Sequence, residues 1–187
     1  MTAVLISVKP KWCEKILNGD KTIEIRKSKP KIETPFKCYI YCTKERTRGE
    51  LVKVKSESLS ILFGKDTCIG TNNAENEDIR LKGKIIGEFI CDDIKWANAL
   101  NLWIDEDAKN TLKGSCLTKE DMYKYLNVKS GTSRYDKKYE FYRWHISELK
   151  IYDTPKELNE FIVERYPCLA KLKRPPQSWC YVTEINS

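Results

Sequence analysis

The stretch Gly19-Asp20-Lys21-Thr22-Ile23-Glu24-Ile25-Arg26 decides the fold of this 187-residue chain. Two isoleucines, Ile23 and Ile25, alternate in it with polar residues, and this period of two predicts a β-strand with the isoleucines turned inward. The polar residues Thr22, Glu24 and Arg26 then share the other face of the strand. The octet therefore predicts a strand with one apolar and one polar face.

Lys21 does not follow this alternation, because in a regular strand it would point away from Glu24. It reaches the side of Glu24 only if the chain bends after Gly19, and glycine readily takes the backbone angles of a bend. Lys21 can thus join Glu24 and Arg26 only through such a bend.

The residues before the octet predict a strand and a helix. Residues 2–8 are apolar and partly β-branched, as in a strand. Pro10 suits the first turn of a helix, and apolar residues then recur at helical spacing as far as Asn18. Gly19 gives that helix a C-terminal stop.

Further strands are predicted after the octet, at 37–43, 84–94, 139–149 and 178–185, with a loop at 29–35. The spacing of Thr118 and Asp121 is that of a capping box and predicts a helix beginning there. The sequence Asp153-Thr154-Pro155 predicts the start of a short helix that runs through residue 163.

Strands at the beginning, middle and end with helices between them predict an α+β fold class, with a mixed, barrel-like sheet and peripheral helices. Neither a repeat nor a linker divides the chain. We therefore expect a single domain over residues 1–187, with an irregular insertion at about 46–82 and a helical excursion at about 95–135.

The octet resembles the signature G-x-K-x-x-E-x-R of the ASCH domains, a branch of the PUA-like superfamily, through Gly19, Lys21, Glu24 and Arg26. The preceding LISVKPKWCEKILN and the later KCYIYCT and KIIGEFICDDI are similar to the elements that flank this signature. The closing RPPQSWCYV is similar to the last strand of some phage and bacterial ASCH proteins. The resemblance covers residues 1–45, 83–95 and the final stretch.

This resemblance implies a PUA-like β-barrel with a basic cleft, into which the lysine, glutamate and arginine of the signature project. It also implies RNA or a modified nucleotide as the ligand. The resemblance also extends to a branch of the family that hydrolyses acylated cytidine. In that branch the position that matches Glu24 holds a threonine, which acts as the nucleophile. A carboxylate at that position could act as a general base that activates water, with Lys21 or Arg26 as electrophile, and Lys21 and Glu24 are the catalytic candidates. Thr22 is an alternative nucleophile, and whether the chain is an enzyme stays open.

The ligand-binding candidates combine the octet with the segment before the last strand: Lys21, Thr22, Glu24, Arg26, Gln177, Ser178 and Trp179. Lysine and arginine suit a phosphate, and a glutamate can accept from the amine of a base. The alternative is a solvent-facing strand on which Glu24 forms an exposed ion pair with Arg26 or Lys21, contributing ~0.2–1 kcal/mol.

The charge of +7 is concentrated at the N-terminal end. Residues 1–55 hold 14 lysines and arginines against six acidic residues, a net charge of +8, and the remaining 132 residues sum to −1. Such asymmetry is typical of a face that binds phosphates. A lysine-rich solvated surface is the alternative interpretation.

Aromatic side chains could stack on the bases of a ligand, and the candidates are Trp12, Tyr39, Tyr41, Trp144 and Trp179. For Trp12, core packing is the favoured interpretation, since it recurs with Ile16 at helical spacing. His145, the one histidine of the chain, is a candidate acid or base, although a structural role is favoured because the sequence shows no partner for it. Cys42 and Cys180 would be nucleophiles only beside a base.

The eight cysteines are spread along a chain in which we see no secretion signal, which predicts reduced thiols and a cytoplasmic location. Cys38 and Cys42, the closest pair, would lie about 13 Å apart on a strand, too far for one zinc ion. We expect neither a metal nor a cofactor. No run reaches the ~18 apolar residues of a membrane span, so no membrane partner is expected.

Three functions are compatible with these patterns. The first is a domain that binds nucleic acid, RNA foremost, or a modified nucleotide in a basic cleft. The second is a hydrolase of an acylated nucleoside or of RNA, and the third is an adaptor that binds a protein through 46–82 or 95–135. The first ranks highest because the octet and the charge distribution both support it. The oligomeric state has no signature in the sequence.

Overall fold

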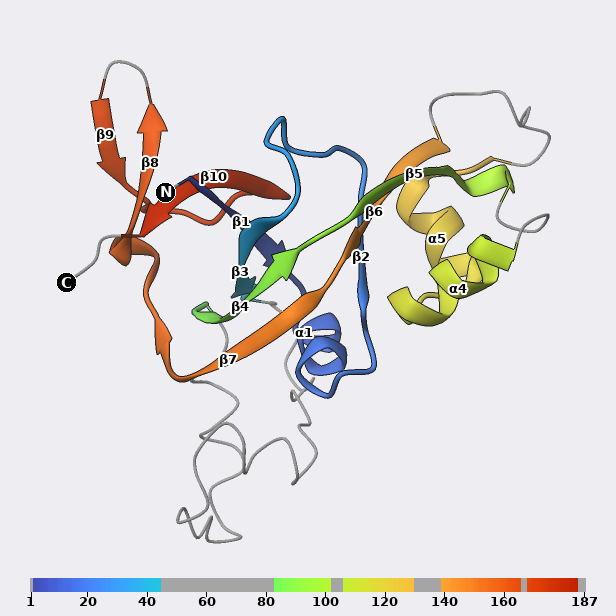
Figure 1. Cartoon of the computed structure of the whole chain (residues 1–187), viewed down its shortest axis with the longest axis horizontal. Coiled ribbons are helices and arrows are strands. Elements are labelled where there is room, and N and C mark those ends of the chain that lie inside the picture. Colours follow the sequence, from blue (N-terminus) through green and yellow to red (C-terminus); the bar gives the residue numbers. More distant parts are fainter. Residues whose placement is uncertain (1, 45–82, 102–105, 130–138, 166–167, 185–187) are drawn as a thin grey trace, which may run out of the picture.

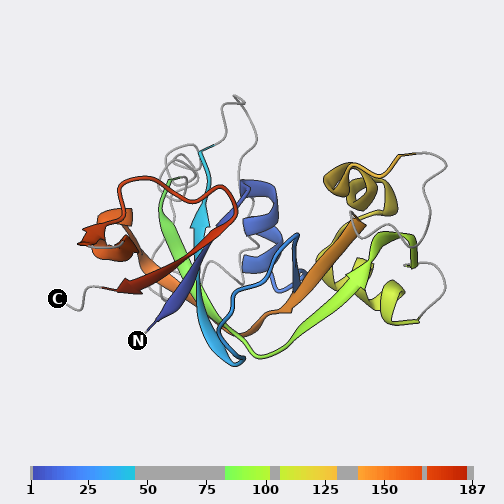
Figure 2. The ribbon, with the colours of Figure 1, turned by 90° about the horizontal axis from the view of Figure 1, so that it is seen from above.

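A computed structural model describes residues 2–44, 83–101, 106–129, 139–165 and 168–184 of the chain. The described strands form two sheets (Figure 1). The large sheet has the order β7-β4-β3-β1-β10-β8-β9, and the small sheet has the order β2-β6-β5. Figure 2 shows the two sheets on opposite sides of the molecule, with α4 and α5 beside the small one.

The large sheet is built from β1 (Ala3–Val8), β3 (Phe36–Cys42), β4 (Ile85–Cys91), β7 (Ser147–Lys156), β8 (Phe161–Arg165), β9 (Cys168–Lys171) and β10 (Trp179–Glu184). β1 lies inside it, parallel to β3 and antiparallel to β10. Five of its six residues are buried, which is why residues 2–8 are almost continuously apolar. The predicted first and last strands are confirmed, and they pair with each other.

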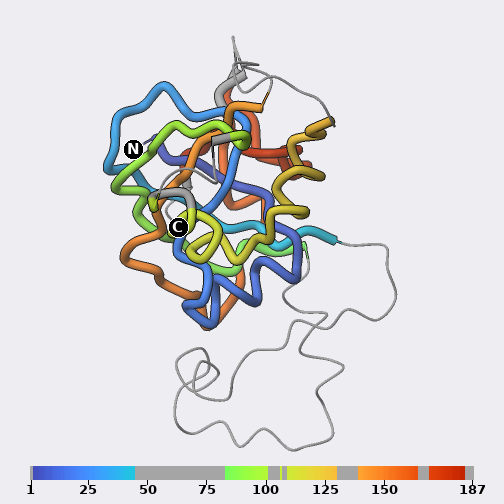
Figure 3. The backbone as a smooth tube through the Cα atoms, turned by 90° about the vertical axis from the view of Figure 1, so that its right-hand side faces the viewer, coloured from blue at the N-terminus to red at the C-terminus, as the bar shows by residue number. Residues whose placement is uncertain are grey.

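The small sheet is built from β2 (Ile23–Arg26), β5 (Ile94–Asn98) and β6 (Glu140–His145). The helices are α1 (Pro10–Leu17), α4 (Glu106–Ser115) and α5 (Lys119–Leu126), with 3-10 turns η1 (Ala99–Asn101) and η3 (Leu158–Glu160). Helices α4 and α5 lie on the side of the molecule that faces the viewer in Figure 3. The fold class is α+β, as predicted, and both described sheets are open in order, so a closed barrel is not confirmed.

Two predicted strands are each divided between the sheets. The run 84–94 becomes β4 and β5, with the break at Asp92 and Asp93, and the run 139–149 becomes β6 and β7, with the break at Ile146. At both breaks the chain passes from one sheet to the other, and the amide of His145 donates to the carbonyl of Asp93 at 2.9 Å, so the two breaks are adjacent. An apolar run cannot show at which residue its strand changes sheets.

The predicted helix from Asp153 through residue 163 is wrong. β7 continues to Lys156, where it pairs with Ile85 of β4, and η3 and β8 follow. Pro155 is tolerated because β7 is an edge strand of the large sheet. Pairing with β4 therefore overrides a local helix signal.

The helix signal at Thr118 is confirmed, since the amide of Asp121 donates to the Thr118 hydroxyl and the amide of Thr118 donates to the Asp121 carboxylate. The predicted excursion at 95–135 contains most of β5, η1, α4 and α5, while the predicted insertion at 46–82 lies outside the described residues. No helix in the described ranges is long and apolar enough to cross a membrane.

Three apolar clusters fill the structure. One lies between α1 and the large sheet, one on the other face of that sheet, and one between the small sheet and α4 and α5. Trp144 of the small sheet belongs to the first cluster, where its ring meets the edge of Phe36 at 5.9 Å between centroids. The small sheet thus packs with its two faces into two different clusters.

Replacing Gly87 by alanine should destabilise the protein by about 1–3 kcal/mol, because overpacked sites relax only by moving their neighbours. A Cβ atom at Gly87 would lie 2.6 Å from the Lys150 carbonyl oxygen and 3.2 Å from the Ile151 Cα, so β7 would have to shift. Urea unfolding measures the change. The control is Glu148→Gly on β7, where φ is 46° and the side chain is exposed. If Gly87→Ala unfolds like the wild type, the packing of β4 on β7 is looser than described.

Candidate functional site

Lys21 enters the structure through the bend that the sequence requires. Gly19 has a φ of 71°, and the Lys21 amide donates to the Lys15 carbonyl at 3.0 Å, which turns the chain at the end of α1. The Lys21 side chain is 4% exposed. Its ammonium donates to the carbonyls of Ile23 at 2.8 Å and Ser115 at 3.0 Å, and it lies 3.3 Å from a Glu24 carboxylate oxygen.

Glu24 lies between two cations. Its Oε2 is the oxygen near Lys21, and its Oε1 is 2.9 Å from Nη2 of Arg26. All three side chains are at most 9% exposed. Lys21, Glu24 and Arg26 therefore form one buried triad, and the alternative interpretation of an exposed ion pair is wrong.

Arg26 connects the two sheets. It belongs to β2 of the small sheet, but its Nη1 donates to the carbonyl of Ser178 at 3.0 Å and its Nη2 to the carbonyl of Ser7 at 2.9 Å. Ser7 is in β1 of the large sheet and Ser178 directly precedes β10. The Arg26 Nε is buried and has no hydrogen-bond partner. The other two guanidinium nitrogens are thus both engaged inside the protein.

A cleft of about 840 Å³ opens over the triad. It is lined by Ser7, Val8, Lys9, Lys11, Trp12, Lys21, Glu24, Ile25, Arg26, Thr43, Lys44, Leu117, Asp121, Lys124, Tyr125, Gln177 and Ser178. Six of these side chains are basic and two are acidic. Since Glu24 is already engaged by two cations, the remaining charge of the cleft is positive and suits an anionic ligand.

Two aromatic rings line the cleft from different helices. Trp12 of α1 has the Lys11 ammonium 4.3 Å and the Lys21 ammonium 5.5 Å from its ring centroid. Tyr125 of α5 is 40% exposed, and the Lys27 ammonium lies 5.1 Å from its ring. Burial raises the pKa of Tyr125, although the Arg26 charge opposes this shift. The phenol therefore stays neutral near neutral pH and can donate a hydrogen bond.

The structure brings together five of the seven predicted ligand-binding residues. Lys21, Glu24, Arg26, Gln177 and Ser178 line the cleft. Thr22 and Trp179 are not among its lining residues, and Thr22 is exposed.

Trp179 instead packs on Trp144, with 6.1 Å between the ring centroids, and its indole nitrogen donates to the Ser28 hydroxyl at 3.0 Å. Tyr39, Tyr41 and Trp144 are buried in the apolar clusters and offer no ring to a ligand. Trp12 contacts the first cluster and also lines the cleft. It therefore has the core contact that the sequence favoured and also faces the space for a ligand.

His145 has a partner that the sequence did not show. Its Nδ1 lies 2.7 Å from a carboxylate oxygen of Asp92, and both side chains are nearly half exposed. Burial is the largest single influence on the pKa of Asp92 and raises it, but the hydrogen bonds with His145, the Asp92 backbone and Ser147, together with the charge of His145, lower that pKa overall. The two residues join the adjacent breaks between the sheets, away from the residues that line the cleft.

Sequence reasoning missed the contribution of α5 to the cleft. Asp121, Lys124 and Tyr125 line it, and their spacing of three and four residues places them on one face of a helix. Lys9 and Lys11 beside Trp12 were a second signal, a basic and aromatic cluster at the start of α1. Neither signal says that the two helices face the same cleft.

The described cysteines are structural thiols. Cys13, Cys38, Cys42 and Cys91 are buried, and Cys116 and Cys180 are partly exposed. Burial raises the pKa of Cys13 and of Cys38 well above the ordinary value, and it raises the pKa of Cys91 to about 12. Among the residues that the structure covers, no three histidine, cysteine or acidic side chains are grouped to hold a metal ion.

Alkylation with iodoacetamide at about pH 8 should modify Cys116 and Cys180 much faster than Cys13, Cys38 and Cys91, because only the thiolate reacts and burial suppresses it. Peptide mass spectrometry over time measures each site. In concentrated urea the five sites should react at similar rates. Rapid modification of Cys38 or Cys91 in the folded protein would contradict their burial between the strands.

Comparison with known proteins gives matches among solved structures. No protein-family model matches the chain, and no curated protein matches it. The chain is similar to the crystal structure of ASCH from Zymomonas mobilis, with 16% identity and a TM-score of 0.48 over 96% of this chain and 86% of that one. Two point mutants of the same protein give 15% identity and TM-scores of 0.48 and 0.49, covering 96% of this chain and 88% and 87% of theirs.

Removing the charge of Glu24 should destabilise the fold. Glu24→Gln leaves Lys21 and Arg26 buried without an anion, and breaking a buried ion pair in this way costs about 3–5 kcal/mol. Urea unfolding measures this loss, with Glu148→Gln, which changes an exposed glutamate on β7, as the matched control. A loss below about 1 kcal/mol would show that water reaches the triad.

Proposed function

We propose that this chain is an ASCH-type domain that binds RNA or a nucleotide in the cleft over the Lys21–Glu24–Arg26 triad. The observation that carries the proposal is the lining of the cleft, where six basic side chains and two accessible aromatic rings surround one volume of about 840 Å³. Cations attract the phosphates and rings stack on the bases, which are the two requirements for binding a single strand.

The cleft divides these roles between its rim and its floor. Lys9, Lys11 and Lys124 belong to α5 or to the start of α1 and supply positive charge that is independent of the triad. A phosphate bound by them would displace counterions, which makes the affinity depend on salt. Trp12 and Tyr125 supply the rings.

The floor of the cleft offers directed hydrogen bonds. The buried Nε of Arg26 is a donor without a partner, and the Glu24 carboxylate has more acceptor sites than the two contacts it makes. A donor beside an acceptor suits the edge of a base, such as one with a carbonyl and an exocyclic amine. This pair would supply selectivity, while the rim supplies affinity.

The triad itself is an unsuitable place to test binding, because Arg26→Ala would also remove the bonds to Ser7 and Ser178. A loss of binding in that variant would not be separable from a loss of fold. The lysines of the rim avoid this difficulty. Lys11 and Lys124 are the best pair, since they lie on different helices and neither belongs to the triad.

The double variant Lys11→Gln/Lys124→Gln should bind single-stranded RNA more weakly than the wild type. If each lysine contacts one phosphate, the slope of log affinity against log salt should fall in magnitude by about 1.4, because each phosphate contact on a single strand contributes about 0.7. Fluorescence anisotropy with a labelled eight-nucleotide RNA over a salt series measures both quantities.

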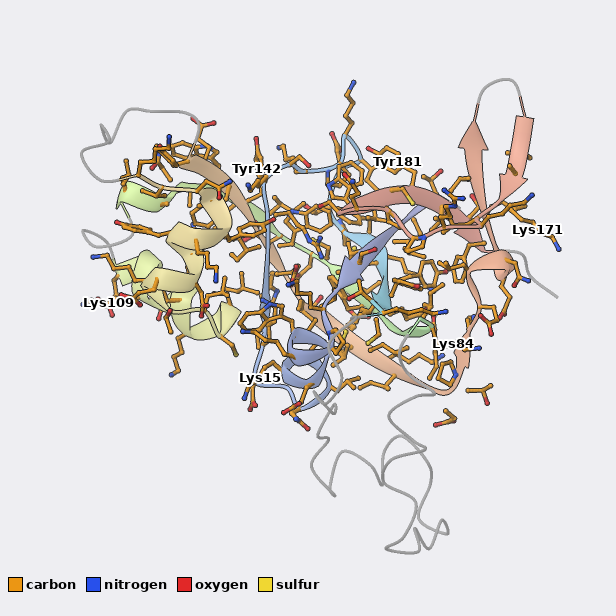
Figure 4. The ribbon with its side chains drawn as sticks, turned by 180° about the vertical axis from the view of Figure 1, so that it is seen from behind. Lys15, Lys84, Lys109, Tyr142, Lys171 and Tyr181 are labelled. Carbon is orange, nitrogen blue, oxygen red and sulfur yellow. The ribbon has the colours of Figure 1, made fainter. Side chains whose placement is uncertain are left out.

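The matched control is Lys171→Gln, which changes an exposed lysine of β9 at the far end of the large sheet (Figure 4). It should keep the affinity and slope of the wild type. Wild-type protein that binds neither RNA nor nucleotides, or binds them independently of salt, would refute the proposed function. Equal losses in the control and the double variant would assign the effect to overall charge rather than to the cleft.

Hydrolysis of an acylated nucleoside or of RNA is a weaker proposal for the same cleft. The Lys21 ammonium already has three acceptors, and both Glu24 oxygens hold a cation, so neither group is free to exchange a proton with a substrate. Thr22 lies outside the cleft lining. Mass spectrometry of RNA and acylated nucleosides after incubation with the protein separates turnover from binding. For the adaptor hypothesis, residues 46–82 lie outside the described part of the chain.

A further inference from the structure

A row of three side chains crosses the small sheet from the cleft to its outer strand. In the strand register Arg26 of β2 is opposite Tyr142 of β6, and Tyr142 is opposite Trp96 of β5. Residues that are opposite each other in antiparallel strands share one face of the sheet. Arg26, Tyr142 and Trp96 are therefore neighbours on one face, and Arg26 lines the cleft.

The outer end of this row is an exposed tryptophan. The Trp96 side chain is 53% exposed, whereas Trp144, two residues from Tyr142 on the same face, is fully buried. The inner half of the face packs into the core through Trp144, and the outer half carries Trp96 on an edge strand. A large ring in solvent at the end of a buried row is available for stacking.

Lysine ammonium groups lie beside one aromatic ring at the cleft and beside another ring of the row. The Lys27 ammonium lies 5.1 Å from the ring of Tyr125, which lines the cleft, and the Lys29 ammonium lies 5.8 Å from the ring of Tyr142. Figure 4 shows Tyr142 and Tyr181 of β10 toward the same edge of the molecule. Rings interleaved with lysines suit a nucleic-acid strand, which carries both bases and phosphates.

We infer that a single-stranded nucleic acid leaves the cleft past Arg26 and stacks a base on Trp96. This inference rests on the proposed function and narrows its ligand from a nucleotide to an oligonucleotide. Two strand spacings of about 4.8 Å separate Arg26 from Trp96, roughly 10 Å in total. At about 3.4 Å per stacked nucleotide this distance corresponds to about three nucleotides beyond the one in the cleft.

A duplex does not fit this arrangement, because its bases are already stacked on one another and present only their edges. Stacking on Trp96 and Tyr142 needs unpaired bases with free faces. A single strand is therefore preferred to a duplex because the exposed ring of Trp96 needs an unpaired base, whatever the base sequence. A mononucleotide held in the cleft would not reach Trp96.

The test compares Trp96→Ala with the wild type, using an eight-nucleotide RNA, a dinucleotide of the same bases and the eight-nucleotide RNA annealed to its complement. Loss of one stacked base costs about 1–3 kcal/mol, so Trp96→Ala should bind the eight-nucleotide strand about 5- to 150-fold more weakly. The dinucleotide should bind both proteins equally. The wild type should prefer the single strand to the duplex.

Two further variants complete the design. Trp96→Phe keeps a ring and should recover most of the affinity, and Leu169→Ala removes another exposed apolar side chain, 69% exposed on β9, and should change nothing. Thermal unfolding followed by circular dichroism checks that each variant is folded.

The outcomes separate this inference from the proposed function. If Trp96→Ala binds the eight-nucleotide strand like the wild type while Lys11→Gln/Lys124→Gln does not, the path over Trp96 is wrong and the cleft function stands. If Trp96→Ala weakens the dinucleotide and the longer strand equally, the path is also wrong. If the wild type binds none of the three ligands, the proposed function itself fails.

Discussion

The buried triad of Lys21, Glu24 and Arg26 is the constraint on which the rest of the structure depends. Three charged side chains have left water together, and each charge is compensated inside the protein. Besides Glu24, their partners are main-chain carbonyls of β1, β2, the end of α4 and the segment before β10. Burying charges without such partners would cost several kcal/mol per ion, so these four segments must meet where they do. The cleft is the space left above this meeting point, which is why its floor is polar and its walls come from both sheets.

The same contacts explain how the small sheet is held. Trp144 inserts into the core of the large sheet on one side, while Arg26 bonds to Ser7 and Ser178 nearby. The chain crosses between the sheets at Asp92–Asp93 and at Ile146, and the backbone bond from His145 to Asp93 joins the two crossings. An apolar anchor, an ionic anchor and two crossings together fix the small sheet. Its outer half then projects from the body of the protein, and this projection leaves Trp96 in solvent.

The sequence predicted the residues of the triad because a period of two and a glycine bend are local properties. It also predicted Ser178 and Gln177, through the proline pair that brings the chain into its last strand. It did not predict that the triad is buried, because the acceptors that make burial possible are main-chain carbonyl oxygens. Every residue type has such a carbonyl, so the sequence does not show which ones accept. The helix expected over 153–163 was wrong for a related reason. The local signal at Pro155 was real, but pairing with β4 is a contact across some 70 residues and no local pattern carries it. Tyr125 and Lys124 were missed because their spacing predicts a shared helix face but does not predict which part of the molecule that face contacts.

Glu24 determines the charge balance of the floor of the cleft. A threonine hydroxyl at this position would be neutral, and the two neighbouring cations could then stabilise negative charge developing on a substrate. The Glu24 carboxylate balances one of these two positive charges, and it forms ion pairs with both Lys21 and Arg26. The charges of the floor then interact mainly with one another. In the proposed function, the lysines of the rim therefore attract the phosphate. A floor whose charged groups hold one another in place agrees with the recognition of a base edge that we propose. The charge balance of the triad thus agrees with the proposed role in binding rather than in turnover.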